Sequence, residues 1–386
     1  MDSPAELMAA ARDETGLDDF GDDSFRDGLD RLCHALQTEA KLNDVGEFAL
    51  PQLLGKLLTN RLQIEDWYRR HPEIDDELIE SPLIGLGLPR TGSSALSHLL
   101  AEDPNARSLR VWEAGRPCPP PATVEGPDPR IAEVEFNMAM QHEIAPRLAQ
   151  LVPMAPNGPE ECQDLMALDF KSHYFQAFAN IPSYSDWLVE ADLRSTYAYE
   201  KRVLKLLQWR QPRQPWRLKC PTHLLFLPAL NEVFPDARFV MTHRDPTDVM
   251  VSVADLCAVV QQMFADEVDL PYQGRLNVEH WSLGMHRAME FRAAGNDDRF
   301  FDLDFAAVQG DPIAEVRRLY AWLDEPVTPD FEAGMRRWWA DFAEQREQNI
   351  HPPAADFGLD LDAVRPLFAD YVTKAAAWTA APTGSN

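Results

Sequence analysis

The chain has 386 residues, of which 45% are hydrophobic, so it is long enough for one large α/β domain with appendages or for two domains. Its 36 basic and 63 acidic residues give a formal net charge of −27, and no basic face of the kind that nucleic-acid binding requires is visible. Nucleic acid is therefore excluded as a partner, and an anionic ligand has to be met by a local cluster of cations.

The first 80 residues are expected to form a helical region that packs on the rest of the chain. Leucines recur every three or four residues over 25–41 and again over 50–68, which is typical of amphipathic helices. A shorter helix is expected over 6–12. We interpret this region as a helical brace or lid.

Residues 83–87 (Leu-Ile-Gly-Leu-Gly) form an apolar run that favours a strand buried on both faces of a parallel sheet. A glycine-rich turn follows, and then leucines at helical spacing. Strand, glycine loop and helix together suit an anion, because glycines let backbone N–H groups approach and the helix start offers unpaired donors. The hydroxyls of Thr91, Ser93 and Ser94 are expected to add donors. The residues predicted to contact the anion are Arg90, Thr91, Gly92, Ser93 and Ser94.

This loop departs from the nucleotide-triphosphate pattern G-x-x-x-x-G-K-[ST], because Ser93 stands where that pattern has lysine. Arg90 is the only cation in the loop, so nothing at the lysine position holds a β,γ-phosphate. We expect an anion other than Mg-ATP. A strand–helix connection without a ligand is the alternative.

The middle of the chain combines a proline-rich surface segment with apolar helices. A short second strand over 109–112 is expected to precede Glu113, and prolines then dominate 117–129. Residues 130–210 are predicted to be mostly helical, with one helix over 187–207. Their aromatic residues and methionines indicate either an ordinary core or a cap over an apolar substrate.

Strand and helix patterns alternate in the remaining sequence. Strands are expected over 216–219, 238–242 and 300–305, and helices over 224–234, 247–264 and 313–323. The predicted fold class is therefore α/β, with a central parallel sheet and helices on both faces. We place this domain at 81–375, with a helical insertion at about 115–210 and a tail at 376–386 that is frayed from Pro382 onward.

A second anion site is predicted where the strand 238–242 ends. Arg244 follows this strand, and Ser252 lies two turns into the next helix. A guanidinium and a hydroxyl at the carboxyl end of a parallel strand can hold one phosphate.

Two motifs resemble those of sulfotransferases that use 3′-phosphoadenosine 5′-phosphosulfate (PAPS), and the resemblance extends over roughly residues 5–375. Residues 87–94 resemble the 5′-phosphosulfate loop of that family, and Arg244 and Ser252 fall on its 3′-phosphate positions. Residues 218–224 (Leu-Lys-Cys-Pro-Thr-His-Leu) resemble the Lys-Ser-Pro-x-His segment of its bacterial members. The resemblance implies a P-loop-like sulfotransferase fold and direct transfer of a sulfuryl group from PAPS to a hydroxyl or amine. It also implies 3′,5′-adenosine bisphosphate (PAP) as product and no metal.

The resemblance also implies catalytic roles. Lys219 is expected to stabilise the leaving group or the SO3, and a solvated lysine at a strand's end is the alternative. Glu113 is preferred as general base, because family members with a pair like Asp103-Pro104 carry a base glutamate in that region. His223 competes, although its spacing from Lys219 is longer than in members that use a histidine. The structural alternatives are a helix cap or arginine partner for Glu113 and a helix-start hydrogen bond for His223.

An apolar cap implies an apolar alcohol, phenol or lipid as the small-molecule acceptor. Two other classes of protein stay open. One is a small-molecule kinase with a degenerate loop, which would need magnesium. The other is an inactive nucleotide-binding scaffold, which would bind a nucleotide without turnover. The sequence also leaves the oligomeric state open, including a homo-oligomer.

The cysteines and the N-terminal sequence bear on the cellular compartment in which the protein is expected. The five cysteines are scattered and lack metal-ligand spacing, so we expect neither a disulfide framework nor a metal site. The N-terminus has no signal-peptide pattern, and no apolar run approaches the ~20 residues of a membrane span. We expect a cytoplasmic protein without a transmembrane segment.

Overall fold

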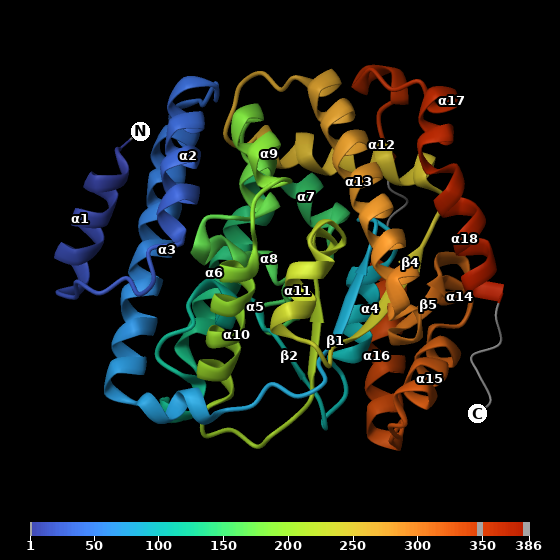
Figure 1. Ribbon diagram of the computed structural model, residues 1–386, viewed down its shortest axis with the longest axis horizontal. Coiled ribbons are helices and arrows are strands. Elements are labelled where there is room, and N and C mark those ends of the chain that lie inside the picture. The colour runs from blue at the N-terminus through green and yellow to red at the C-terminus, as the bar shows by residue number, and fades with distance from the viewer. Residues whose placement is uncertain (1, 346–349, 381–386) are drawn as a thin grey trace.

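A parallel sheet forms the centre of the fold in the computed structural model, which describes residues 2–345 and 350–380 (Figure 1). Within these residues the sheet has five strands in the order β2-β3-β1-β4-β5. Their bounds are β2 Arg107–Ser108, β3 Trp216–Lys219, β1 Leu83–Gly87, β4 Arg238–His243 and β5 Phe300–Asp304. β1 pairs with β3 on one side and with β4 on the other. Because all pairs are parallel, the segments that follow β1, β3 and β4 emerge at the same edge.

Helices cover both faces of the sheet, as the fold class predicts. Two hydrophobic cores lie against the sheet. Ile84, Leu86 and Phe239 belong to the core that the sheet shares with α3, α10 and α13. The neighbouring Leu83 and Val240 belong to the second core, which includes α4, α15 and α16. This alternation follows from the two-residue period of a strand. The bounds are α4 Ser93–Leu100, α10 Arg194–Gln208, α13 Leu270–Phe291, α15 Pro312–Leu323 and α16 Pro329–Gln345.

Three N-terminal helices belong to the first of these cores; the first and third are longer than predicted and the second ends three residues earlier. They are α1 Pro4–Thr15, α2 Phe25–Thr38 and α3 Asp44–Arg70. α3 begins before its leucine stripe because the Asn43 side chain accepts the backbone N–H of Gly46, which caps the helix. The buried Arg61 side chain donates to the carbonyl oxygens of Phe20 and Leu168 and so ties α3 to the insertion.

The second strand is shorter than predicted and lies earlier. β2 is Arg107–Ser108, and residues 111–115 form the helix α5 Val111–Gly115. The Glu113 carboxylate accepts the backbone N–H of Arg110, which starts a helix where the apolar pattern predicted a strand.

Most of the insertion is helical. Its helices are α6 Pro129–Ile144, α7 Pro146–Leu151, α8 Gln163–Met166, α9 Pro182–Leu188 and α10. The prediction of one helix over 187–207 is wrong. The chain turns between α9 and α10, where the Asp192 carboxylate accepts the backbone N–H of Arg194. Phe136 and Ile144 on α6 are 65% and 69% exposed, so this helix is not part of the core.

The remaining helices are α11 Leu227–Val233, α12 Pro246–Gln261, α14 Phe305–Gly310, α17 Leu361–Val364 and α18 Ala369–Ala380. α18 buries Tyr371 and Ala375, so a helix occupies the first five residues of the segment predicted as a tail. Residues 381–386, where fraying is expected, lie outside the described residues. None of the helices in the described part of the chain is long and apolar enough to cross a membrane.

Candidate active site

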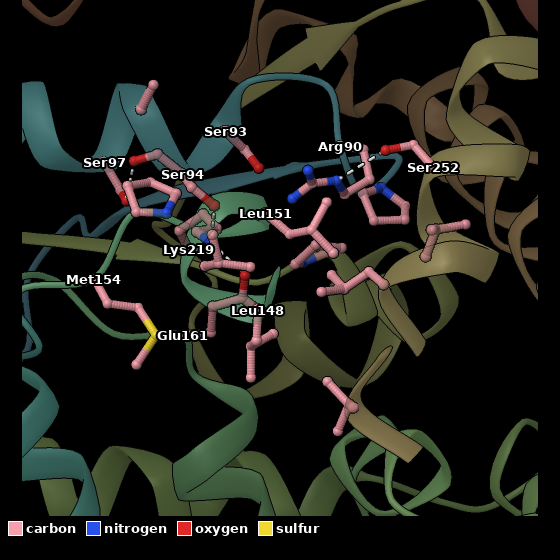
Figure 2. A pocket seen from close by; sticks show the side chains of 18 of the residues that line it. Arg90, Ser93, Ser94, Ser97, Leu148, Leu151, Met154, Glu161, Lys219 and Ser252 are labelled. Carbon is pink, nitrogen blue, oxygen red and sulfur yellow. Dashed lines mark hydrogen bonds and ion pairs between the residues drawn. The ribbon is translucent and has the colours of Figure 1, made fainter. Parts of the chain in front are cut away.

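A cavity of about 1430 Å³ opens where β1, β3 and β4 end. Its wall includes the glycine loop, the ends of the strands and parts of α7 and α12 (Figure 2). The structure brings most of the predicted site residues together in this wall: Arg90, Gly92, Ser93, Ser94, Lys219, Arg244 and Ser252. Thr91, Glu113 and His223 are not among the lining residues.

Backbone geometry explains the two glycines of the loop. Gly87 has φ +136°, and a Cβ there would come within 2.6 Å of the Thr242 carbonyl oxygen in β4. Gly92 has φ +88° and forms the N-cap of α4, where no side chain caps the first backbone N–H groups. Ser93 and Ser94 are the first residues of α4, so their hydroxyls and the free N–H groups of the helix lie at the cavity wall.

Two arginines and one serine form the cationic end of the cavity. Arg90 Nε donates to Ser252 Oγ at 3.1 Å, and Arg244 Nη1 donates to the Arg90 carbonyl oxygen at 3.1 Å. The Arg244 guanidinium also lies 4.6 Å from the centre of the Phe305 ring. Burial, together with the charge of Arg244, lowers the pKa of Arg90. Two cations this close favour binding of a multiply charged anion such as a phosphate.

Lys219 links the glycine loop to a carboxylate. Its side chain, at the end of β3, is only 7% exposed, so the alternative of a solvated lysine is wrong. Gly85 in β1 leaves room for its stem, since a Cβ there would lie 3.2 Å from Lys219 Cγ. Lys219 Nζ lies 3.3 Å from Ser94 Oγ and forms an ion pair with Glu161 (Figure 2).

Glu161 and its neighbour Glu160 are cavity residues that the sequence analysis missed. The backbone N–H of Cys162 donates to the Lys219 carbonyl oxygen at 3.1 Å, which holds this segment beside β3. Burial raises the pKa of Glu160 to about 7. The only signal in the sequence is a pair of adjacent carboxylates after Pro159 in an otherwise apolar region.

Glu113 is paired with neighbouring groups and is not among the residues that line the cavity. Arg107 Nη2 donates to its Oε1 at 2.5 Å, and the backbone N–H of Arg110 donates to its Oε2 at 3.0 Å. The side chain is only 3% exposed. Both alternatives to catalysis therefore hold, because Glu113 is a helix cap and an arginine partner.

His223 is also placed away from the cavity. It is fully buried, and its Nδ1 lies 3.0 Å from the Tyr197 hydroxyl. Among the described residues it belongs to the one group of potential metal ligands, in which ligand atoms of Cys162, Glu200 and His223 lie within 4.8 Å of one another. Burial lowers the pKa of His223 to about 3 and raises that of Glu200 to about 8. The cluster can therefore stay uncharged at neutral pH without a metal ion.

The Thr91 hydroxyl stabilises the loop instead of facing the cavity. It donates to the Leu88 carbonyl oxygen at 2.7 Å and lies 2.6 Å from Thr242 Oγ1 in β4. The expectation that this hydroxyl is available to a ligand is therefore wrong.

The other end of the cavity is largely apolar. Leu148 and Leu151 of α7 line it, together with Leu256 and Val260 of α12 and the aromatic Phe178 (Figure 2 labels both leucines of α7). The insertion was interpreted either as an ordinary core or as a cap over a substrate. Because side chains of this part form a wall of the cavity, the interpretation as a cap applies to it. This apolar part of the wall belongs to the same cavity as the Lys219–Glu161 pair.

Comparisons with known proteins agree on one family. A family model described as the sulfotransferase family matches residues 82–329. The omega-hydroxy-beta-dihydromenaquinone-9 sulfotransferase Stf3 of Mycobacterium tuberculosis is 26% identical over 285 residues, which are 70% of this chain and 69% of that protein. The crystal structure of sulfotransferase STF9 from Mycobacterium avium has a TM-score of 0.86 and 32% identity, covering 97% of each chain. That of STF1 from Mycobacterium tuberculosis has a TM-score of 0.84 and 30% identity, covering 96% of this chain and 99% of that one.

Proposed function

Because the chain belongs to the sulfotransferase family, we propose that it moves a sulfuryl group from PAPS to the hydroxyl of an apolar acceptor and releases PAP. The observation that carries the proposal is the position of the Lys219–Glu161 pair. The pair lies in the wall of a cavity whose one end carries the two arginines and whose other end is apolar. Lys219 also contacts Ser94, the last residue of the glycine loop.

The donor would bind at the cationic end. Ser93, Ser94 and the N–H groups at the start of α4 suit the 5′-phosphosulfate, and Arg244 with Ser252 suits the 3′-phosphate. Arg90 donates to Ser252 and so lies between these two groups. This arrangement supports a bisphosphorylated nucleoside, since each phosphate would meet its own donors.

In the reaction the acceptor oxygen would attack sulfur as the bond between sulfur and the bridging phosphate oxygen breaks. The bridging oxygen leaves with its electron pair on PAP, and the acceptor's proton passes to a carboxylate. We assign that carboxylate to Glu161, because it contacts Lys219 at the junction of the two ends. Lys219 would neutralise the charge that develops on the SO3 group and on the leaving oxygen.

An apolar alcohol, phenol or lipid is the acceptor class that the cavity supports. Leu148, Leu151 and Phe178 offer a surface that favours hydrocarbon over a charged sugar. The curated relative is named for its action on an omega-hydroxylated dihydromenaquinone, which is in keeping with this class.

Calorimetric titration tests the donor. PAP and ATP would each be titrated with and without magnesium. We expect PAP to bind tightly without the metal and ATP to bind weakly in both conditions. Preference for Mg-ATP would instead support a small-molecule kinase. Tight PAP binding without transfer of ³⁵S-labelled sulfate to a panel of long-chain alcohols and phenols would support an inactive scaffold.

A further inference from the structure

The C-terminal helix α18, which lies beside β5, contacts the turn that carries Arg244 (Figure 1). Arg244 and Asp245 form this two-residue turn between β4 and α12. The Tyr371 hydroxyl of α18 lies 3.2 Å from Nδ1 of His243, the last residue of β4. Burial raises the pKa of Tyr371, and a hydrogen bond with the backbone of Arg244 opposes this rise. One hydroxyl thus contacts two consecutive residues at the end of β4.

The hydrogen bonds continue from this hydroxyl to a buried ion pair. His243 Nε2 lies 2.7 Å from Asp302 Oδ1 in β5, and Arg292 donates to the two oxygens of Asp302 at 2.7 and 2.9 Å. Although burial raises the pKa of Asp302, hydrogen bonds from Arg292 and His243 hold it below its usual value, so the carboxylate is charged at neutral pH. A charged carboxylate only accepts, so His243 donates to it from Nε2, and Nδ1 of the neutral ring accepts from the Tyr371 hydroxyl. The oxygen of that hydroxyl is then the acceptor for the backbone N–H of Arg244.

Burial makes this chain of groups rigid. His243, Arg292 and Tyr371 are each at most 3% exposed. The guanidinium of Arg292 also packs 3.6 Å from the centre of the Trp378 ring, and Trp378 lies two turns after Tyr371 on the same face of α18. Breaking any of these hydrogen bonds would leave a buried polar atom unpaired, so the groups keep their positions.

We propose that Tyr371 is a positioning residue for the 3′-phosphate of the donor and acts through Arg244. The inference rests on the proposed function, which assigns Arg244 to that phosphate. Tyr371 and His243 are not among the residues that line the cavity, so they can act on a phosphate only through the turn. Because the turn is held in place before the donor binds, little binding free energy is lost in ordering it.

The effect of Tyr371 should be specific to the 3′-phosphate. PAP and 5′-AMP differ only in that group, so the ratio of the dissociation constant of 5′-AMP to that of PAP measures its contribution. A variant that is merely less stable would keep this ratio. Loss of one hydrogen bond that fixes the turn should lower the ratio about three- to tenfold, the scale of a single neutral hydrogen bond.

The test measures both dissociation constants by calorimetry without magnesium. Tyr371→Phe removes the hydroxyl and keeps the ring, so PAP should bind about three- to tenfold more weakly while the affinity for 5′-AMP is unchanged. Tyr320→Phe is the matched control. The Tyr320 hydroxyl is equally buried and donates to Asp103 Oδ2 at 2.8 Å, and neither of these residues lines the cavity. This control should lower the melting temperature and leave the ratio unchanged.

His243→Gln is a second variant that tests the same contact. Glutamine can still donate to Asp302, but it has no group in the place of Nδ1. We expect the ratio to fall as it does in Tyr371→Phe, and to fall no further when the two changes are combined, because both act through one hydroxyl. If Tyr371→Phe does not fold, His243→Gln alone decides.

An unchanged ratio in the folded Tyr371→Phe protein, or an equal fall in Tyr320→Phe, would overturn the inference and leave the proposed function intact. Failure of the wild-type protein to bind PAP more tightly than 5′-AMP would instead contradict the 3′-phosphate site of the proposed function, and the inference would fall with it.

Discussion

Glu161→Gln is the substitution that most directly tests the proposed chemistry. Glutamine keeps the size of the side chain and can still accept a hydrogen bond from Lys219, but it cannot take a proton. Loss of a general base typically costs a factor of about 10²–10⁴ in rate, equivalent to roughly 3–5 kcal/mol in activation free energy. Because Glu161 is assigned no contact with PAPS, we expect kcat to fall by this factor while the affinity for PAP changes little.

Glu113→Gln provides a matched control with the same chemical change. The ion pair of Glu113 with Arg107 is buried, with side-chain exposures of 4% and 13%, so solvent screens it little. Loss of a charged hydrogen bond of this kind costs about 1.5–3 kcal/mol in stability. We therefore expect a melting temperature lower by a few degrees and a kcat close to that of the wild type at temperatures where the variant is folded.

Single-turnover transfer of ³⁵S-labelled sulfate from PAPS to the best alcohol of the panel measures both variants. Calorimetry with PAP supplies the binding control. If Glu113→Gln loses turnover while Glu161→Gln keeps it, the assignment of the base is wrong. If Glu160→Gln alone loses turnover, Glu160 is the base. In that case its pKa of about 7 would place the rising limb of the wild-type rate near pH 7.

Three further changes test other parts of the site. Arg244→Ala should weaken PAP binding by about 1.5–3 kcal/mol, the scale of a lost charged hydrogen bond, and an unchanged dissociation constant would contradict its role at the 3′-phosphate. Lys219→Met should lower kcat by about 10²–10³ and change PAP affinity much less, whereas the reverse pattern would make Lys219 a donor-binding residue. Glu200→Gln should reduce the pH dependence of stability. With a pKa of about 8 in the folded chain against 4.5 for a free glutamate, Glu200 contributes stability that is full below pH 4.5 and is lost as the pH rises toward 8. The melting temperature should thus fall more in the wild type than in Glu200→Gln between pH 5 and pH 8.5, and equal falls would show that Glu200 is already ionised.

Four of the five strands and the common location of the two motifs could be predicted because their signals are local. β1 and β3 have the predicted bounds. β1 is a short apolar run that a glycine-rich turn follows, and this pattern leaves little choice for where the strand ends. Arg244 and Ser252 could be placed at one site because the carboxyl ends of parallel strands meet at one edge of a sheet. The prediction of a strand over 109–112 shows the limit of this reasoning. The Glu113 carboxylate caps a helix there, and the apolar pattern alone does not reveal it.

The candidate base could not be predicted in this way. Glu161 lies 58 residues before its partner Lys219 and reaches it only because the insertion returns to the sheet. The hydrogen bond from the Cys162 backbone to the Lys219 carbonyl oxygen fixes this return, and backbone groups carry no sequence signal. The family resemblance instead pointed to Glu113 and His223, which are buried and are not among the residues that line the cavity.

The partners of each carboxylate are the reason why we assign the base to Glu161 and not to Glu113. A base must exchange a hydrogen-bond partner with the substrate, so its partners have to lie where the substrate binds. The carboxylate of Glu161 pairs with Lys219 and accepts from Gln163 Nε2, and both of these residues line the cavity. The partners of Glu113 are Arg107 and the backbone of Arg110, and neither residue is part of the cavity wall. An acceptor hydroxyl can replace a partner of Glu161, whereas Glu113 could accept a proton only by breaking the contacts that hold α5 to β2.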